Sequence, residues 1–435
     1  MLGGEAREPS ILSYFYIITV LTQEIVHTLR MLTKSGCQYR RIHNCLRSLG
    51  KRMTNAGLKN KGKTNDDMNE RRIAAEEYAN VSLSNIGSIS FDAIAAEKNV
   101  ENMIGAIQIP LGYVGPYKIN GDYASGEFLV PMATTEGALI ASVNRGCSVI
   151  SKSGGAYAKV VHDEMTRAPV FRTENISHAV KVSDWINENF DRIKNVAEST
   201  TSHGKLVSIN SFPAGRSLHV RFAYSTGDAM GMNMATIATE AASKLIEDET
   251  GAVMISVSGN MCTDKKPAAI NSILGRGKTV VADATIPKDI LEEKMHTTAQ
   301  AVAETCFRKC ALGSAMAGSL GQNAHAANMV AALYIATGQD PAQVVEGSLC
   351  MTSCEDIGDD LYISVRMPAI EVGSVGGGTK LPCQKEALDL IGCAGSGKSK
   401  KLAEIVASVV LAGELSTLCA QAAGHLGKAH SRLGR

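Results

Sequence analysis

Hydrophobic and polar positions between Pro169 and Val257 follow two different periods. Leu218, Val220 and Phe222 place an apolar residue at every second position, which is typical of a strand with one buried face. Longer stretches space their apolar residues as an amphipathic helix does. The predicted strands and helices alternate as strand, helix, strand, strand, helix, strand, at 170–173, 182–196, 206–211, 218–224, 232–247 and 253–257. This βαββαβ order predicts a small ferredoxin-like domain.

The rest of the chain predicts a larger domain into which the small one is inserted. Met316–Gly338 is long, apolar and rich in alanine and glycine, which suits a buried central helix. Lys400–Leu418 has the spacing of a second amphipathic helix. We therefore expect an α/β (α+β) fold with a helix-rich large domain. Its expected parts are a helical segment at 66–104, the large domain at 105–168 and 257–435, and the small domain at 169–256.

The segment 66–104 is polar and favours helix. Arg71 and Arg72 stand at pairing distance from Glu76 and Glu77 on one predicted helix. We interpret this segment as a solvated helical face without a functional site.

Composition excludes some classes of function. Lys and Arg total 44 against 43 Asp and Glu, so the whole molecule is not a polyanion binder. Hydrophobic residues make up 45% and aromatic residues only 5%, which is typical of an Ala/Gly/Val/Met-rich α/β protein. The eleven cysteines are odd in number and lie singly in apolar segments, which favours a reducing compartment.

Two cysteine pairs have helical spacing, Cys306 with Cys310 and Cys350 with Cys354. Four thiolates so spaced could bind zinc. No Gly-rich knuckle accompanies either pair, so we interpret these cysteines as small core residues and expect no metal.

The N-terminal region 1–65 predicts an extension rather than part of the fold. Ile11–Thr22 is apolar but falls short of the roughly 20 residues that span a bilayer. From Ile25 to Asn65 the chain has no acidic residue and many basic ones, which resembles a mitochondrial transit peptide, with Met31 as an alternative start. A disordered basic tail, or a nucleic-acid arm, are the alternatives. No aromatic spacing supports base stacking, so we favour targeting, with a cytosolic location as the alternative.

Acidic and basic side chains gather at one predicted strand end. Ala252–Val257 reads as a buried strand, and Asp264, Lys265 and Lys266 follow it in the segment Ser258–Pro267. A buried lysine is costly unless paired, so this cluster predicts an electrostatic site for developing negative charge. A solvated loop is the alternative.

Two isolated groups could carry protons. Glu136 stands at a predicted helix start within Pro131–Arg145, where it could cap the helix or, if buried and raised in pKa, donate a proton. His430 lies in a short C-terminal tail. Histidine titrates near neutrality, so a mobile tail could bring it to a site, although most terminal histidines are solvated and idle.

Two glycine-framed loops could approach an anionic ligand. Gly227–Met234 opens a predicted helix whose first N–H groups could face a pyrophosphate. Gly373–Thr379 is a flexible loop that could bring backbone close to a ligand. Neither has the G-x-G-x-x-G pattern after a strand, so a Rossmann assignment fails.

Gly392–Ser399 matches the P-loop pattern G-x-x-x-x-G-K-[ST]. Only 36 residues follow Ser399, too few for an ordinary nucleotide domain with its magnesium-binding acid. We interpret the match as chance and keep a P-loop ATPase as an alternative hypothesis. A second alternative is a non-catalytic nucleic-acid or membrane-surface adaptor that acts through residues 25–65.

Several long motifs in one order resemble the 3-hydroxy-3-methylglutaryl-coenzyme A (HMG-CoA) reductase family, of the eukaryotic type. The resemblance runs from about Glu101 to His430. The motifs that carry it are Glu101–Gly105, Pro131–Arg145, Asp228–Met234, Asp264–Asn271, Gly313–Ser319, Asn323–Asn328, Gly338–Asp340 and Gly376–Thr379.

The resemblance implies a four-electron reduction of HMG-CoA to mevalonate and free coenzyme A with two NADPH, the first pathway-specific step of isoprenoid and sterol synthesis by the mevalonate route. By family position, Lys265 would stabilise the oxyanion and Asp340 would hold Lys265. Glu136 would be the proton donor to the aldehyde, and His430 would protonate the departing thiolate. The cluster would titrate as a coupled unit.

The resemblance also implies binding roles. The hydroxymethylglutaryl group would be held by Arg167, Ser258, Asp264, Lys266, Lys309 and Asn328. Coenzyme A would be held by Ser142, Asn144, Arg145 and His325. NADPH would be held within the small domain and beside it, by Asp228, Met230, Gly231, Met232, Asn233 and Gly376.

Four departures from the family pattern change the expectation. His296 stands where vertebrate-type sequences have a coenzyme A-binding lysine, and Thr201–His203 replaces the Ser-Arg of the 2′-phosphate loop, which leaves NADPH over NADH open. The chain ends at Arg435 without the regulatory serine, and no sterol-sensing membrane domain precedes the match. We therefore expect a soluble form without an integral membrane segment or the phosphorylation switch. The family also implies a homodimer or homotetramer with shared active sites, supported here by the glycine-rich, apolar stretch 101–116.

Overall fold

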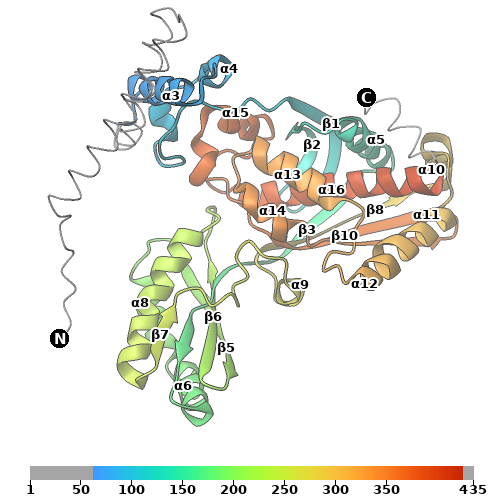
Figure 1. Ribbon diagram of the computed structural model, residues 1–435. Helices are drawn as coiled ribbons and strands as arrows, with labels where there is room; N and C mark the ends of the chain where they lie inside the picture. The colour runs from blue at the N-terminus through green and yellow to red at the C-terminus, as the bar shows by residue number, and fades with distance from the viewer. Residues whose placement is uncertain (1–61, 425–435) are drawn as a thin grey trace, which may run out of the picture. The chain divides into compact units, whose positions relative to one another are not determined.

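The computed structural model describes residues 62–424 (Figure 1). Contacts along the chain group it into two compact units, 1–107 and 108–435. Most of the expected N-terminal extension, and His430, lie outside the described residues. The predicted domain boundaries stay predictions.

The first unit consists of short helices. They are α3 (Asn65–Ala79), α4 (Ser84–Gly87) and the 3₁₀ helix η2 (Ala93–Ala96). Arg72 and Glu76 form the expected pair on α3, with Nη1 and Oε1 3.1 Å apart. Arg71 contradicts the prediction of a solvated face, because its side chain is buried and its Nε donates to the Met103 carbonyl at 2.8 Å. The long arginine side chain thus reaches across this small unit and donates a hydrogen bond to a backbone carbonyl that would otherwise lack a partner.

The small domain has the predicted βαββαβ order. Its elements are β4 (Val170–Arg172), α6 (Ile176–Glu188), α7 (Phe190–Glu198), β5 (Lys205–Ala214), β6 (Ser217–Ser225), α8 (Met232–Thr250) and β7 (Val253–Ser256). The four strands pair antiparallel in the order β7-β4-β6-β5, with the helices packed on the sheet (Figure 1). The helix predicted at 182–196 is two helices, because Asn189 ends α6 by donating its side-chain Nδ2 to the Trp185 carbonyl at 2.9 Å.

The strand β7 differs from its prediction as a buried strand. Val253 and Ile255 are 41% and 57% exposed. Among the described strands β7 pairs only with β4, so it lies at a sheet edge. An apolar run therefore did not signal burial here.

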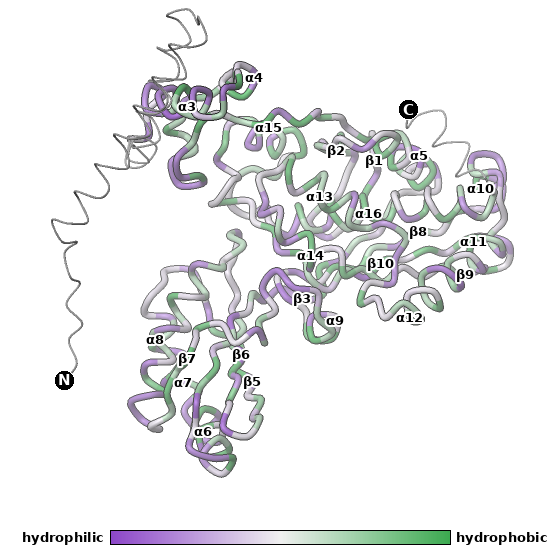
Figure 2. The backbone as a smooth tube through the Cα atoms, viewed as in Figure 1, coloured by the Kyte–Doolittle hydropathy of each residue, from purple (hydrophilic) through white to green (hydrophobic). Residues whose placement is uncertain are grey.

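The large domain is built on a six-stranded sheet. Its strands are β1 (Leu111–Gly121), β2 (Ser125–Ala133), β3 (Ala156–Arg167), β8 (Gly277–Ile286), β9 (Met351–Ile357) and β10 (Asp360–Ile370). They pair in the order β2-β1-β3-β8-β10-β9, and only β1 and β3 are parallel. β3 joins both sheets, because Tyr157–Glu164 pairs with β8 and Met165–Arg167 pairs with β6. Where β3 passes from one sheet to the other, its residues are hydrophilic: His162, Asp163 and Glu164 (Figure 2).

Helices complete the large domain. They are α5 (Leu139–Lys152), α9 (Ala269–Leu274), α10 (Lys288–Met295), α11 (Ala299–Cys306), the π-helix η3 (Phe307–Gly313), α12 (Ser314–Ala317), α13 (Ala326–Ala336), η4 (Pro341–Gln343), α14 (Val344–Gly347), η5 (Gly377–Lys380), α15 (Pro382–Leu390) and α16 (Ser399–Ala422). The single helix predicted at Met316–Gly338 is wrong. Gly318 ends α12 in a left-handed conformation (φ 67°), and the chain turns before α13 begins.

α16 is the central helix of the large domain. Among the described helices it alone is long and apolar enough to span a membrane, but 94% of its most apolar window is buried inside the protein, as in a core helix. Two buried carboxylates on it bind loop backbone. Glu404 accepts from the Ala124 N–H at 2.6 Å, and Glu414 accepts from the Ala324 and His325 N–H groups at 2.7 and 2.8 Å. A core helix thus fixes the loops that carry the candidate site.

Gly146 on α5 and Gly413 on α16 both pack closely against other segments, and we predict losses of different size when each is replaced by alanine. A Cβ added to Gly146 would lie 2.0 Å from the Ala412 carbonyl oxygen, which is backbone. A Cβ added to Gly413 would meet the flexible end of Met329 at 2.6 Å. We expect Gly146→Ala to lower the free energy of unfolding by about 1–3 kcal/mol and Gly413→Ala to change it by less. Urea unfolding of both variants checks this, and equal losses would contradict it.

Candidate active site

Lys265 lies in a loop of tight turns between β7 and α9. Asn260, Thr263 and Lys265 all have left-handed backbone, with φ of 65°, 56° and 57°. This region is unfavourable for residues other than glycine, so contacts from the surrounding structure must hold the loop. One such contact is the hydrogen bond that the backbone N–H of Lys265 donates to the carboxylate of Glu346.

A buried network centred on Arg276 supports this loop. Arg276 is fully buried, and its Nη1 lies 2.7 Å from Glu346 Oε1 and 3.4 Å from Glu371 Oε1. Its Nη2 lies 3.1 Å from Asp264 Oδ1. Burial raises the pKa of Glu371 well above its usual range and also raises that of Glu346, while Arg276 acts against both shifts. Burial lowers the pKa of Arg276, but the carboxylates of Glu371, Glu346 and Asp264 raise it above its usual value, so Arg276 remains charged.

Asp264 connects this network to polar side chains at the surface. Its Oδ2 lies 3.8 Å from Arg167 Nη1, and its backbone carbonyl accepts from Lys266 Nζ at 2.9 Å. Ser258 Oγ lies 3.2 Å from Cys262 Sγ in the same loop. Arg167 and Lys266 thus contact Asp264, the neighbour of Lys265 in the chain, and Ser258 lies in the same loop.

Lys265 and Asp340 form an ion pair, with Nζ and Oδ2 2.8 Å apart. Asp340 is itself oriented, because its Oδ1 accepts from the Ala342 N–H at 3.0 Å at the start of η4. The hydrogen bond to Asp340 raises the pKa of Lys265 above its usual value. The site therefore presents an ammonium donor held in one position, which is what stabilising an oxyanion requires.

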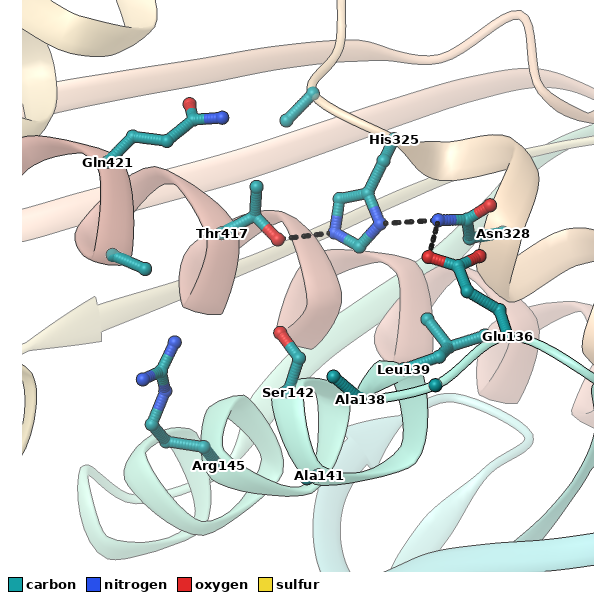
Figure 3. A pocket seen from close by; sticks show the side chains of 13 residues that line it. Glu136, Ala138, Leu139, Ala141, Ser142, Arg145, His325, Asn328, Thr417 and Gln421 are labelled. Atoms are coloured by element: carbon teal, nitrogen blue, oxygen red, sulfur yellow. Dashed lines mark hydrogen bonds between the residues drawn. The ribbon is translucent and has the colours of Figure 1, made fainter. Parts of the chain in front are cut away.

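A second group of predicted residues lines a cavity of about 310 Å³ (Figure 3). His325 Nε2 lies 3.0 Å from the Gly413 carbonyl and 2.6 Å from Thr417 Oγ1. A carbonyl only accepts, so Nε2 carries the proton and Nδ1 accepts from Asn328 Nδ2 at 3.3 Å. The same amide nitrogen lies 3.3 Å from Glu136 Oε1. Asn328 thus connects Glu136 to an oriented imidazole.

The opposite wall of this cavity carries the predicted coenzyme A residues. Arg145 Nη2 donates to the Ser416 carbonyl at 2.9 Å, and Ser142 Oγ lies 2.9 Å from Ser416 Oγ. Both come from α5 and face the cavity (Figure 3). Asn144 points elsewhere, because its Oδ1 accepts from the Gly115 N–H at 2.8 Å.

Glu136 does not lie at a helix start as predicted. α5 begins at Leu139, and its N-cap is Ala138, which makes no side-chain cap hydrogen bond. Glu136 is exposed in the loop before it, where its N–H donates to Thr134 Oγ1 at 3.0 Å. The capping alternative is therefore wrong, and Glu136 is exposed rather than buried within one chain.

The two groups are not joined directly. Among the described residues no hydrogen bond or ion pair links Glu136 to Lys265 or Asp340. A second cavity, of about 560 Å³, lies between them, since both Pro267 and His325 line it. Lys309 is exposed on the π-helix η3.

The predicted nucleotide segments lie side by side. The backbone carbonyl of Asp228 accepts from the Ser374 N–H at 2.8 Å, and Ala229 forms a parallel bridge with Val375. α8 begins at Met232, directly after Gly231, and the first turn has no side-chain cap. Met230 and Asn233 flank this helix start, and Gly376 follows the bridge. Free N–H groups and open glycine backbone at one place suit a dinucleotide phosphate.

No group of three or more His, Cys, Asp or Glu side chains between residues 62 and 424 is placed to hold a metal ion. Cys306 hydrogen-bonds with Cys310, which lowers its pKa, but contact with Cys354 and burial raise that pKa to about 12 overall. Zinc binds thiolates, so protonated buried thiols fit the interpretation as core residues.

Sequence reasoning missed the buried charges beneath the site. Arg276, Glu346, Glu371 and Glu414 are not among the residues that the sequence analysis singles out. One signal was available in the sequence, namely a charged residue inside an apolar run, such as Glu346 within Val344–Gly347. A charged side chain that is fully buried is almost always paired, so such a residue indicates a buried partner.

Comparisons with known proteins agree on one family. Residues 67–435 match the sequence profile described as "Hydroxymethylglutaryl-coenzyme A reductase". The chain is 54% identical over 372 residues to the 3-hydroxy-3-methylglutaryl-coenzyme A reductase of Methanocaldococcus jannaschii, covering 84% of this chain and 92% of that protein. It is 46% identical over 381 residues to reductase 1 of Dictyostelium discoideum, covering 84% and 68%. The NADPH-bound class II reductase of Streptococcus pneumoniae has a similar fold, with a TM-score of 0.62, 21% identity and coverage of 75% and 79%.

The ion pair predicts how Lys265 titrates. Because its pKa is raised, the pair stabilises the fold fully below the usual lysine value of about 10.4, and this contribution is lost as pH rises through the raised pKa. Asp340→Asn removes the main cause, so the pKa of Lys265 should fall. The ¹⁵N shift of Nζ measured against pH checks this, with Lys385, paired to Asp389, as internal reference. An unchanged titration of Lys265 would contradict the assignment.

Proposed function

The chain belongs to the hydroxymethylglutaryl-coenzyme A reductase family, and we propose that it reduces HMG-CoA to mevalonate and free coenzyme A with two NADPH. The observation that carries this is the 2.8 Å pair of Lys265 and Asp340. The backbone of Lys265 is fixed by buried Glu346, so the ammonium is held ready before substrate arrives.

The first reduction converts the thioester to an aldehyde. NADPH supplies one hydride to the carbonyl carbon in each reduction. As the new C–H bond forms, negative charge develops on the thioester oxygen, and the ammonium of Lys265 stabilises it by a hydrogen bond. When the C–S bond then breaks, the coenzyme A thiolate takes a proton, for which His430 is the predicted donor.

The second reduction converts the aldehyde to the alcohol. The aldehyde oxygen needs a proton as the carbon receives hydride, and Glu136 is the predicted donor. Asn328 donates to Glu136 Oε1 at 3.3 Å and to His325 Nδ1 at 3.3 Å. Asn328 thereby positions the carboxyl group at the mouth of the cavity that we assign to coenzyme A.

NADPH would lie at the start of α8, where Gly231 and Met232 present free backbone N–H groups and Gly376 gives open backbone. The relative from Streptococcus pneumoniae was solved with NADPH bound. At the predicted 2′-phosphate loop, Thr201 Oγ1 accepts from the His203 N–H at 3.3 Å, so the loop is a closed turn that carries histidine instead of arginine. A preference for NADPH is thus a proposal to be tested against NADH.

We also propose a homodimer or homotetramer with shared sites. Within one chain Glu136 is exposed and does not contact Lys265. Large apolar side chains are exposed: Met316 at 81%, between the residues Ser314 and Gly318 that line the second cavity, and Ile273 at 77% on α9. A second copy covering this surface would bury them and could bring the two groups of residues together.

Two finer points stay proposals. The eukaryotic type and a role in sterol synthesis are among them, because the chain is 46% identical to the Dictyostelium discoideum reductase but 54% identical to that of Methanocaldococcus jannaschii. The acid-free basic segment 25–65 supports mitochondrial targeting, with the cytosol as alternative. Locating residues 1–65 fused to a fluorescent protein decides between the two compartments.

The reaction is tested by loss of absorbance at 340 nm with HMG-CoA and NADPH. We expect Lys265→Ala to lower kcat by at least roughly two to three orders of magnitude, because the oxyanion loses its donor. Lys288→Ala is a matched control, since Lys288 forms an exposed pair with Asp359 at 2.9 Å. A folded wild type that oxidises neither NADPH nor NADH would overturn the proposal.

A further inference from the structure

The P-loop match binds a carboxylate of the same chain. Its backbone N–H groups surround the carboxylate of Asp228. Gly397 N lies 2.6 Å from Oδ2, and the N atoms of Lys398 and Ser399 lie 3.1 and 3.2 Å from Oδ1. Gly395 and Gly397 have φ of 88° and 76°, which turns successive N–H groups toward one side. A carboxylate of the same chain thus takes the place where a P-loop would bind phosphate.

This contact also caps the central helix. α16 begins at Ser399, and its N-cap residue Lys398 makes no side-chain cap hydrogen bond. The negative charge of Asp228 instead meets the positive end of the α16 dipole. Ser399 Oγ adds a hydrogen bond to the Gly227 carbonyl at 3.3 Å. Burial raises the pKa of Asp228, but the hydrogen bonds from the N–H groups of Gly397, Ser399 and Lys398 together lower it by a larger amount. The pKa therefore lies below its usual value, and the carboxylate stays ionised.

Asp228 ties the same turn to the second glycine loop. Its backbone carbonyl accepts from Ser374 N at 2.8 Å, and the Gly395 N–H donates to the Ser374 carbonyl at 3.2 Å. Gly373 packs so closely that an added Cβ would lie 2.6 Å from Met230 N. Three segments that lie far apart in the sequence are therefore fixed to the buried helix α16.

We propose that the turn Gly395–Ser399 is a carboxylate-binding turn that positions Asp228 and the 373–378 loop to receive NADPH, and that it binds no nucleotide itself. This inference rests on the proposed function. A turn tethered to a core helix is ordered before the ligand arrives, so less entropy is lost on binding. The residues of the turn act through Asp228 and are positioning residues.

The test compares two glycines with the same backbone conformation. Gly397 (φ 76°) makes the turn, while Gly358 (φ 73°) lies between β9 and β10, and both have open space around them. Valine strains either position equally, so Gly358→Val controls for general loss of stability. The measurements are the Kd of NADPH by fluorescence titration, the Kd of HMG-CoA by calorimetry and the Tm of each variant.

We expect Gly397→Val to raise the Kd of NADPH by about tenfold while that of HMG-CoA changes by less than about twofold, and Gly358→Val to change neither. If Gly397→Val does not fold, the same comparison is made with Ser399→Ala, for which we expect a rise of about threefold. An unchanged Kd of NADPH, or equal losses for both ligands, would overturn the proposal.

The remaining outcomes separate this inference from the proposed function. Saturable binding of Mg-ATP to the wild type that Lys398→Ala abolishes would make the turn a true P-loop and overturn the inference. If the wild type binds no NADPH, both fall. If it binds and oxidises NADPH but the Gly397 and Ser399 variants bind it normally, only this inference falls.

Discussion

The buried guanidinium of Arg276 is the charge on which the candidate site depends. Removing an arginine from water is costly, and the cost is offset only when carboxylates and hydrogen bonds surround it. Here Glu346, Glu371 and Asp264 do so at 2.7, 3.4 and 3.1 Å. Glu346 also holds the backbone of Lys265 in a left-handed conformation. The same buried charge thus fixes Asp264 by its side chain and, through Glu346, Lys265 by its main chain.

A second constraint comes from α16, whose polar residues lie inside the core. Glu414 binds the backbone that precedes His325, and Asp228 binds the start of the helix. Because the helix is almost wholly buried, loops attached to it have little freedom. The cavity that holds His325, and the turn at the start of α8, are therefore both tied to one core helix. Rigid helices and strands thus hold the loops in place, and the loops position the candidate catalytic and binding residues.

The fold could be predicted where one local pattern decides the structure. Period-two alternation predicted β6, and the βαββαβ order followed from the pattern of strands and helices. The prediction was wrong where a single residue or a distant partner decides. Gly318 breaks the apolar stretch predicted as one helix, Asn189 splits another, and the sheet-edge position leaves β7 exposed.

The candidate site shows the same division. Motif resemblance singled out Lys265 and Asp340, which the structure places 2.8 Å apart. It could not show that Glu136 lies in a different group of side chains, because nothing local to residue 136 specifies its distance from residue 265. The network beneath the loop was missed because its members come from four separate segments. Only folding makes them neighbours.

The role of the Arg276 network in positioning Lys265 is tested most directly by Glu346→Gln. This substitution keeps the shape of the side chain but removes the charge between Arg276 and the Lys265 backbone. Steady-state kinetics with HMG-CoA and NADPH, on protein shown to be folded by circular dichroism, should give a kcat lowered by at least about tenfold and a KM for NADPH that is nearly unchanged. A folded Glu346→Gln enzyme with the wild-type kcat would contradict the account.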